Sequence, residues 1–228
     1  YLLFLFVRLP REHEINHHDS SINLKEEISH WYRLGIRVWP ILLTSFVVGL
    51  IDATFWTSGT VLTDRLAQES SMGGMFLSAY MFPFLFAGLL VARWGVDVGK
   101  KKWAARFLML GSMSLMTVGF VDSVFLILVA VGLAGLFIAM AFPLIDSVYT
   151  DLVARARTGR KHIIGMSSAT FSLAYVIGPI ISGFVSGRLG EEMTFTAVGG
   201  LVTMVALYLM WATPKKLKLP QDEIQSWQ

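Results

Sequence analysis

Six stretches of mostly apolar residues, separated by short polar segments, run through the chain. They cover residues 38–62, 72–94, 103–121, 123–145, 163–187 and 193–213. A helix of about 20 residues spans the ~30 Å hydrocarbon core of a bilayer, and each stretch is long enough to do so. The pattern therefore predicts an all-α membrane protein with six transmembrane helices.

Lys and Arg are predicted to lie mostly on one side of the membrane. If all six stretches cross it, 17 of the 19 basic residues fall on one side, and only Arg65 and Arg188 fall on the other. Short cytoplasmic loops carry an excess of Lys and Arg. We therefore expect both ends of the chain to be cytoplasmic and the protein to lie in an inner or plasma membrane. The helices also divide into two groups of three that run in opposite directions, and such 3+3 inverted repeats build many secondary transporters.

Composition excludes several classes of protein. Hydrophobic residues make up 54% of the chain and charged residues 15%, which leaves too little polar surface for a soluble domain. Topology and contact with anionic lipid headgroups account for the net charge of +3, so the expected partner is the lipid bilayer and not a nucleic acid. The sequence contains no Cys and no HExxH, GxSxG or phosphate-binding loop. We therefore expect neither an enzyme nor a cofactor.

The ends of the chain are predicted to lie outside the six-helix unit of residues 38–213. Residues 1–7 are apolar and precede basic residues, the reverse of a signal peptide, so we expect them to end an earlier transmembrane helix of a longer protein. Residues 8–37 form a cytoplasmic linker with an amphipathic helix over 23–35, and residues 214–228 form a cytoplasmic tail. Residues 8–21 of the linker contain three His residues beside acidic ones, which are metal-ligand types, but we expect a solvated segment without a metal.

Asp52 is the main candidate for a functional residue. It lies about 14 residues into the first apolar stretch, where a charged side chain costs ~2.5 kcal/mol or more to insert. We therefore expect it to face a wet cavity or a partner. Two interpretations follow: a proton or cation site, or a structural carboxylate bonded to a neighbouring helix. Trp56, one turn further along, is placed to stack on an aromatic or cationic substrate.

Further polar residues lie in the second and fifth stretches. Ser172 and Tyr175 belong to a stripe of hydroxyl residues in the fifth stretch. Gly178 and Pro179 lie beside this stripe and are expected to disturb the regularity of the helix. Tyr80 is a similar candidate in the second stretch. Hydroxyl groups and small residues serve both helix packing and cavity lining in membranes, and the sequence supports both interpretations.

The loop after the second stretch contains a pattern of Gly and basic residues. The run from Gly88 through Arg93 to Gly95 is followed by Gly99 and further basic residues. This order resembles the loop motif of the major facilitator superfamily: a Gly, an Asp–Arg pair, a Gly and then basic residues. Ala92 stands where the motif has Asp. The resemblance implies that Arg93 and Gly95 take part in gating, with Arg93 bridging to a carboxylate at the end of the fourth span.

Two further segments resemble the same family. Asp151 followed by Arg155 looks like the end of its tenth helix, and residues 165–183 resemble the eleventh helix of its drug-exporter-like members. The resemblance spans the whole chain and corresponds to the family's C-terminal six-helix half. It implies an N-terminal six-helix half as partner, a central cavity lined by the first, second, fourth and fifth spans, and proton-coupled export of a small molecule. The other residues with an expected gating role are Asp146, Asp151, Arg155, Gly178 and Pro179.

A membrane domain of an ATP-driven pump, or a channel subunit, is the alternative. A pump domain needs long cytoplasmic helical extensions to reach its nucleotide-binding partner, whereas the segments 95–102 and 149–162 are short. We therefore expect a secondary transporter that couples a small-molecule substrate to protons or to another ion.

The topology can be tested with single Cys residues, because the chain has none of its own. We expect an impermeant maleimide added outside the cell to label a Cys at Ser70 and not one at Thr158. Permeabilised cells, in which both positions should react, are the control. Labelling at 158 but not at 70 would reverse the topology.

Overall fold

The computed structural model describes residues 24–94, 99–156 and 160–213, and every regular element in these ranges is a helix. Six helical segments of this part of the chain are long and apolar enough to cross a membrane. The predicted all-α membrane fold is confirmed, and the chain is an integral membrane protein. The elements in chain order are α1 (Leu24–Glu69), η2 (Gly73–Met75), α2 (Phe76–Met81), α3 (Phe84–Trp94), α4 (Lys100–Met116), η3 (Val118–Phe120), α5 (Val124–Arg155), α6 (Arg160–Leu189) and α7 (Glu191–Ala212).

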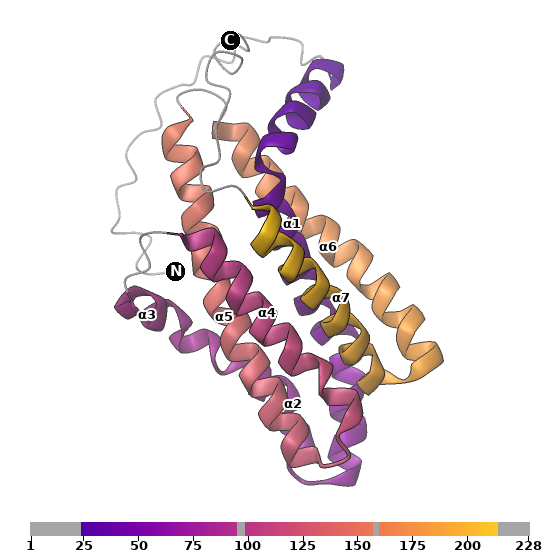
Figure 1. Cartoon of the computed structure of the whole chain (residues 1–228). Helices are drawn as coiled ribbons and strands as arrows, with labels where there is room; N and C mark the ends of the chain where they lie inside the picture. The colour runs from indigo at the N-terminus through magenta and orange to yellow at the C-terminus, as the bar shows by residue number, and fades with distance from the viewer. Residues whose placement is uncertain (1–23, 95–98, 157–159, 214–228) are drawn as a thin grey trace, which may run out of the picture.

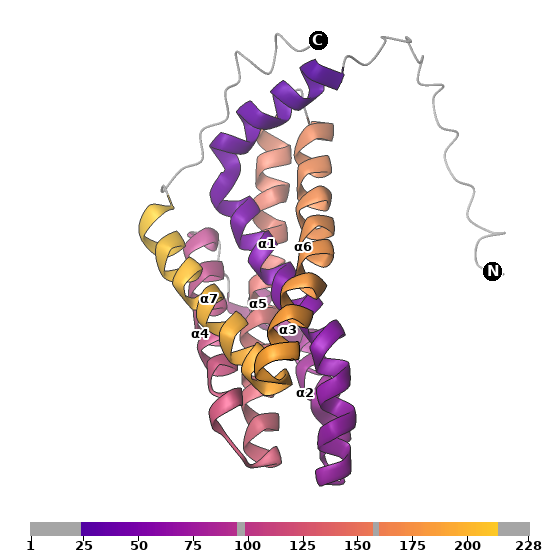
Figure 2. The same cartoon turned by 90° about the vertical axis from the view of Figure 1, so that its right-hand side faces the viewer.

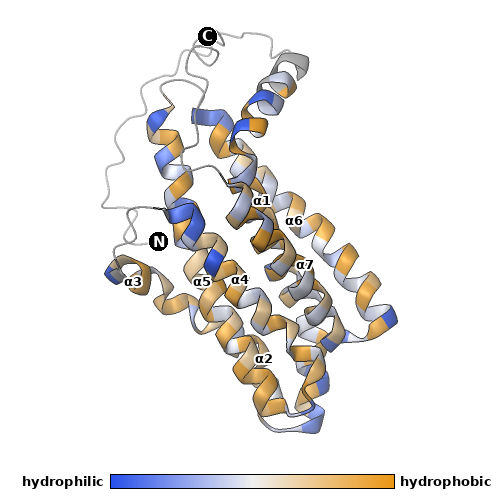
Figure 3. Cartoon of the chain, viewed as in Figure 1, coloured by the Kyte–Doolittle hydropathy of each residue, from blue (hydrophilic) through white to orange (hydrophobic). Residues whose placement is uncertain are grey.

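The long helices lie side by side in one bundle (Figure 1). α4 packs against both α5 and α7, while α1 packs mainly along α6 and also contacts α7. Hydrophobic residues run along the helices, and strongly hydrophilic residues gather toward the helix ends (Figure 3). This distribution fits helices that cross a hydrocarbon layer and place their ends at its two polar interfaces.

α1 joins two predicted elements in one helix. The amphipathic segment over 23–35 and the span over 38–62 were expected to be separate, but the helix is continuous from Leu24 to Glu69. Pro40 lies inside it and removes one backbone hydrogen bond. The hydroxyl of Thr44 donates to the Pro40 carbonyl at 2.7 Å, a bond that also favours bending. Figure 2 shows α1 bent in its first part.

The second span is broken where the sequence analysis expected one helix. Phe82 and Pro83 form a turn between α2 and α3, because Pro83 has no N–H to continue the helical ladder. Beyond this turn α3 diverges from the direction of α2 (Figure 1) and packs against α5.

Small residues bring α4 close to its two neighbours. A methyl group added at Gly111 would lie 2.9 Å from Ile138 Cγ1 of α5, and one added at Gly199 of α7 would lie 2.7 Å from the carbonyl oxygen of Ser112. Helices in lipid gain little from the hydrophobic effect on association, so their contacts depend on such close approach.

The adjacent glycines of α7 provide a matched test of this packing. We expect Gly199→Ala to lower the free energy of unfolding by ~1–3 kcal/mol, the usual cost of overpacking, because backbone atoms of α4 occupy the space. Gly200→Ala should be neutral, since its nearest contact is the flexible end of Met116 at 3.9 Å. Thermal unfolding of the intact protein in detergent measures both. Equal destabilisation by the two variants would contradict the packing argument.

Candidate functional site

Asp52 is held between two other helices in the middle of α1. The Tyr80 hydroxyl of α2 donates to Asp52 Oδ1 at 2.9 Å, and the Tyr175 hydroxyl of α6 donates to Asp52 Oδ2. The fold thus brings together three of the residues predicted from the sequence, although Tyr175 lies 123 positions from Asp52.

Close packing of α1 against α6 allows one of these contacts. A methyl group added at Gly178 would lie 2.6 Å from the Cβ of Ala53, and one added at Gly49 would lie 2.9 Å from the Cβ of Ala174. Each helix therefore presents two small residues, four positions apart, to the other. The carboxylate of α1 and the hydroxyl of α6 belong to residues next to these contacts in the sequence, so the short distance between the helices lets them meet.

The two tyrosines have different surroundings. Tyr80 is fully buried, and its ring stacks on that of Phe55 with the centroids 3.7 Å apart. Tyr175 remains 45% exposed. One oxygen of Asp52 therefore faces the interior of the bundle, and the other faces a side chain at its surface.

The remaining predicted binding residues lie on the same two helices. Trp56 follows Asp52 by one turn and is 52% exposed. Ser172 precedes Tyr175 by one turn and is also exposed. Residues three or four apart share a face of a helix, so Trp56 and Ser172 lie along the stripes that carry Asp52 and Tyr175, although no hydrogen bond joins them to the carboxylate.

Other hydroxyl residues connect helices. Ser58 of α1 and Ser182 of α6 are buried and share a hydrogen bond of 2.6 Å, and Ser45 of α1 shares one of 3.0 Å with Tyr149 of α5. The polar stripe of α6 therefore serves packing at Ser182, while Tyr175 reaches the carboxylate. α6 is one helix with Pro179 inside it, where Pro179 removes one backbone hydrogen bond.

The network at the end of α5 differs from the expected one. Asp151 pairs with Lys100 Nζ at 3.0 Å, whereas Arg93 forms no ion pair within the described residues and is exposed. Two features explain the difference: Ala92 has replaced the acidic residue of the motif, and α3 diverges after Pro83. Lys100 begins α4, beside the end of α5, so the basic run after the loop supplies the partner.

Two other residues with a predicted gating role lie on α5. Asp146 is exposed on α5, and its backbone carbonyl accepts a bond from the Thr150 hydroxyl at 2.9 Å. Arg155 is exposed in the last turn of α5. Gly95 lies outside the described residues.

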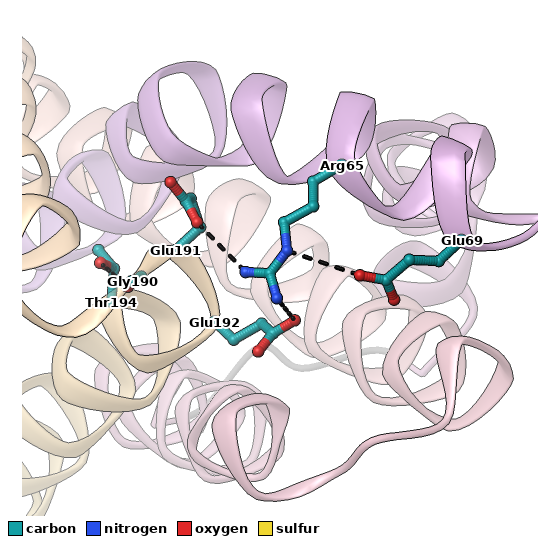
Figure 4. A network of polar contacts seen from close by, with 6 residues as sticks. All are labelled: Arg65, Glu69, Gly190, Glu191, Glu192 and Thr194. Carbon is teal, nitrogen blue, oxygen red and sulfur yellow. Dashed lines mark hydrogen bonds and ion pairs between the residues drawn. The ribbon is translucent and has the colours of Figure 1, made fainter.

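At the opposite end of the bundle, Arg65 joins α1 to the start of α7 (Figure 4). Its guanidinium lies 3.6 Å from Glu69, 3.6 Å from Glu191 and 3.9 Å from Glu192. This cluster was not among the predicted sites. The signal was present, because Arg65 is one of only two basic residues on the side opposite the others. Acidic residues in the first turn of α7 also suit the positive end of its dipole.

No group of three or more metal-ligand side chains lies together in the part of the chain that the structure describes. The His residues between positions 13 and 18 lie outside that part. The described site therefore consists of one carboxylate, two phenols and exposed aromatic surface.

Comparison with known proteins places the chain in a family. The family model described as Major Facilitator Superfamily matches residues 41–228, which include most of α1 and every later helix. A search of curated proteins found no match. The family match covers well over half of the chain and agrees with its six membrane-crossing segments. The chain therefore belongs to the major facilitator superfamily, whose members transport small solutes across membranes.

Proposed function

We propose that the chain forms one half of a proton-coupled exporter of small molecules that works by alternating access, with Asp52 as its proton and substrate site. The observation that carries this proposal is the position of Asp52 inside a membrane span, hydrogen-bonded by Tyr80 and Tyr175 from two other helices. Ionisable residues within spans are costly, and they mark proton and substrate pathways in transporters.

The partners of Asp52 suit reversible neutralisation. Both are phenol hydroxyls, and within the described residues the carboxylate forms no ion pair. Hydroxyl donors stabilise a carboxylate without cancelling its charge. A proton or a cationic group that enters the site can therefore neutralise it, which a permanently paired Lys or Arg would prevent.

The exposed aromatic residues define the proposed substrate class. Trp56 and Tyr175 are about half exposed and lie on the two helices that meet at Asp52. Aromatic faces attract cations and stack on other rings, so we propose an aromatic or cationic small molecule. Export is proposed because residues 165–183 resemble the drug-exporter-like members of the family.

The apolar surface supports the proposed partner, an N-terminal six-helix half. α6 exposes several large apolar residues along its length, although the family resemblance assigns it to the central cavity and not to the lipid face. Those on α6 with more than half of their surface exposed are Ile164, Leu173, Val176, Ile180, Phe184 and Leu189. We propose that they face the other half and the cavity between the halves, with both ends of the chain cytoplasmic.

The proton site is tested by Asp52→Asn in the intact protein. The amide has nearly the same shape but no titratable group, so we expect proton-driven transport to fall about tenfold or more, as expected for losing an interaction of ~1.5–3 kcal/mol. Insertion and yield should stay near wild type. Uptake of a fluorescent aromatic cation into everted vesicles, energised by a proton gradient, measures the effect.

Asp64→Asn is the matched control, because Asp64 is an exposed carboxylate further along α1 and its loss should leave transport unchanged. If Asp52 is instead structural, its variant should fold poorly and the surviving protein should still transport. Wild-type proton coupling in a well-folded Asp52→Asn protein would eliminate the proposed site.

The driving force separates a secondary transporter from an ATP-driven pump. We expect an uncoupler that collapses the proton gradient to stop uptake into the everted vesicles, and vanadate to leave it unchanged, because the proposed carrier draws only on the gradient. Inhibition by vanadate with resistance to the uncoupler would favour the pump.

A further inference from the structure

The two oxygens of Asp52 are bonded in different ways. Oδ1 accepts its hydrogen bond from Tyr80, which is fully buried and stacked on Phe55. Oδ2 accepts its bond from Tyr175, which is 45% exposed. The carboxylate is therefore fixed on one side and accessible through a single surface residue on the other.

We propose that these oxygens have separate tasks. Tyr80 is a positioning residue that keeps its bond to Oδ1, whereas Tyr175 covers Oδ2 and gives up its bond when a proton or a cationic group of the substrate binds there. The inference rests on the proposed role of Asp52 as proton and substrate site. It adds which oxygen exchanges its partner and which residue is displaced.

Several contacts keep Tyr80 in place. Its ring stacks on Phe55 and meets Phe84 edge to face, with ring centroids 5.3 Å apart. Its backbone lies directly against α5, since a methyl group added at Gly135 would be 2.4 Å from the Tyr80 carbonyl oxygen. A buried hydroxyl that left the carboxylate would lose its partner in apolar surroundings, which is unfavourable. Tyr80 therefore stays bonded while the other side of the carboxylate changes.

Tyr175 has the freedom that Tyr80 lacks. Exposed side chains change rotamer rapidly, and a displaced Tyr175 hydroxyl reaches the surface, where other partners are available. Protonation at Oδ2 makes that oxygen a donor and removes the negative charge that strengthened the bond from Tyr175, so it no longer requires the hydrogen of Tyr175. A cationic N–H group satisfies Oδ2 in the same way, by donating in place of the phenol.

Other titratable groups on the helices around α1 are bonded elsewhere or exposed. Tyr149 of α5 shares its hydrogen bond with Ser45, and Asp146 of α5 is exposed. The acidic residues at the start of α7 pair with Arg65, and Arg188 at the end of α6 lies over an aromatic ring. Among the described titratable groups, the two tyrosines alone are bonded to the carboxylate, so exchange at Oδ2 is a competition between Tyr175 and the incoming group.

The first test is labelling by dicyclohexylcarbodiimide, a hydrophobic reagent for protonated carboxyl groups, on the intact purified protein. At neutral pH the labelling rate depends on how readily a proton binds to the carboxylate. We expect Tyr175→Phe to raise this rate about two- to tenfold, the factor for one hydrogen bond, because the proton no longer displaces a hydroxyl. Tyr80→Phe should raise it less, because the bond of Tyr80 to Oδ1 is kept when the proton binds. Mass spectrometry of the peptide that contains Asp52 gives both rates.

The second test is protection of Asp52 by N,N-dimethylbenzylammonium, an aromatic cation with one N–H donor, at neutral pH. Tyr175→Phe should lower the concentration that gives half-protection, because the cation no longer displaces a hydroxyl. Tyr80→Phe should raise it, because the carboxylate is no longer positioned. A purely structural role for both tyrosines would move the two values in the same direction.

Tyr208→Phe is the matched control, since Tyr208 is an exposed tyrosine of α7 that packs on Trp39, and it should behave as wild type. Asp52→Asn gives the background labelling. An equal rise of the labelling rate in both tyrosine variants, or no rise in Tyr175→Phe, overturns the proposal. If Tyr80→Phe does not fold, the labelling rate of Tyr175→Phe decides alone. Neither readout needs transport, so loss of the proposed proton coupling and loss of this exchange can be told apart.

Discussion

The close approach of α1 and α6 is the constraint on which the site depends. In lipid the hydrophobic effect does not drive two helices together, and packing relies on small residues that let backbones meet. Gly49 and Gly178 each leave too little room for a methyl group without a shift of the opposing helix. Because the helices meet so closely here, the phenol of Tyr175 reaches the carboxylate of Asp52 from another helix. A larger side chain at either glycine would separate the carboxylate from this donor.

α1 makes polar contacts with other helices at three levels along its length. Ser45 bonds to α5, Asp52 bonds to α2 and α6, and Ser58 bonds to α6. The outer two levels pair buried neutral groups that satisfy one another, and interhelical bonds of this kind contribute modestly to association, about 0.6–2 kcal/mol each. The middle level differs because it contains an ionisable group and reaches exposed surface. The one ionisable group among these contacts therefore lies at the middle level, while the neutral pairs on either side hold the helices in register.

The sequence predicted those features that depend on composition along one helix. Hydropathy located the spans, and the insertion cost of a charge identified Asp52 together with its neighbours on the same face. Sequence reasoning also named Tyr80 and Tyr175 as polar residues within spans, but spacing on separate helices does not show that they converge on one carboxylate. Arg93 was predicted to bridge to Asp151, which pairs instead with Lys100, because a local motif does not reveal that α3 diverges after Pro83. The ion pairs of Arg65 depend on how the end of α1 meets the start of α7, which is likewise a property of tertiary packing.

The ion pairs at the two ends of the bundle differ in kind from the contacts in its middle. The pair of Lys100 with Asp151 and the cluster around Arg65 include side chains that are up to half exposed, and such pairs contribute only about 0–1 kcal/mol each. They set the register of neighbouring helix ends but do little to hold them together. The glycine contacts of α1 with α6 and of α4 with α5 and α7 are buried and leave almost no free space. Buried packing therefore holds the helices together, and the ion pairs at their ends can be lost at small cost. In the proposed alternating-access carrier, these ion pairs are the contacts that can break and re-form as the helix ends move, while the buried packing between the helices stays intact.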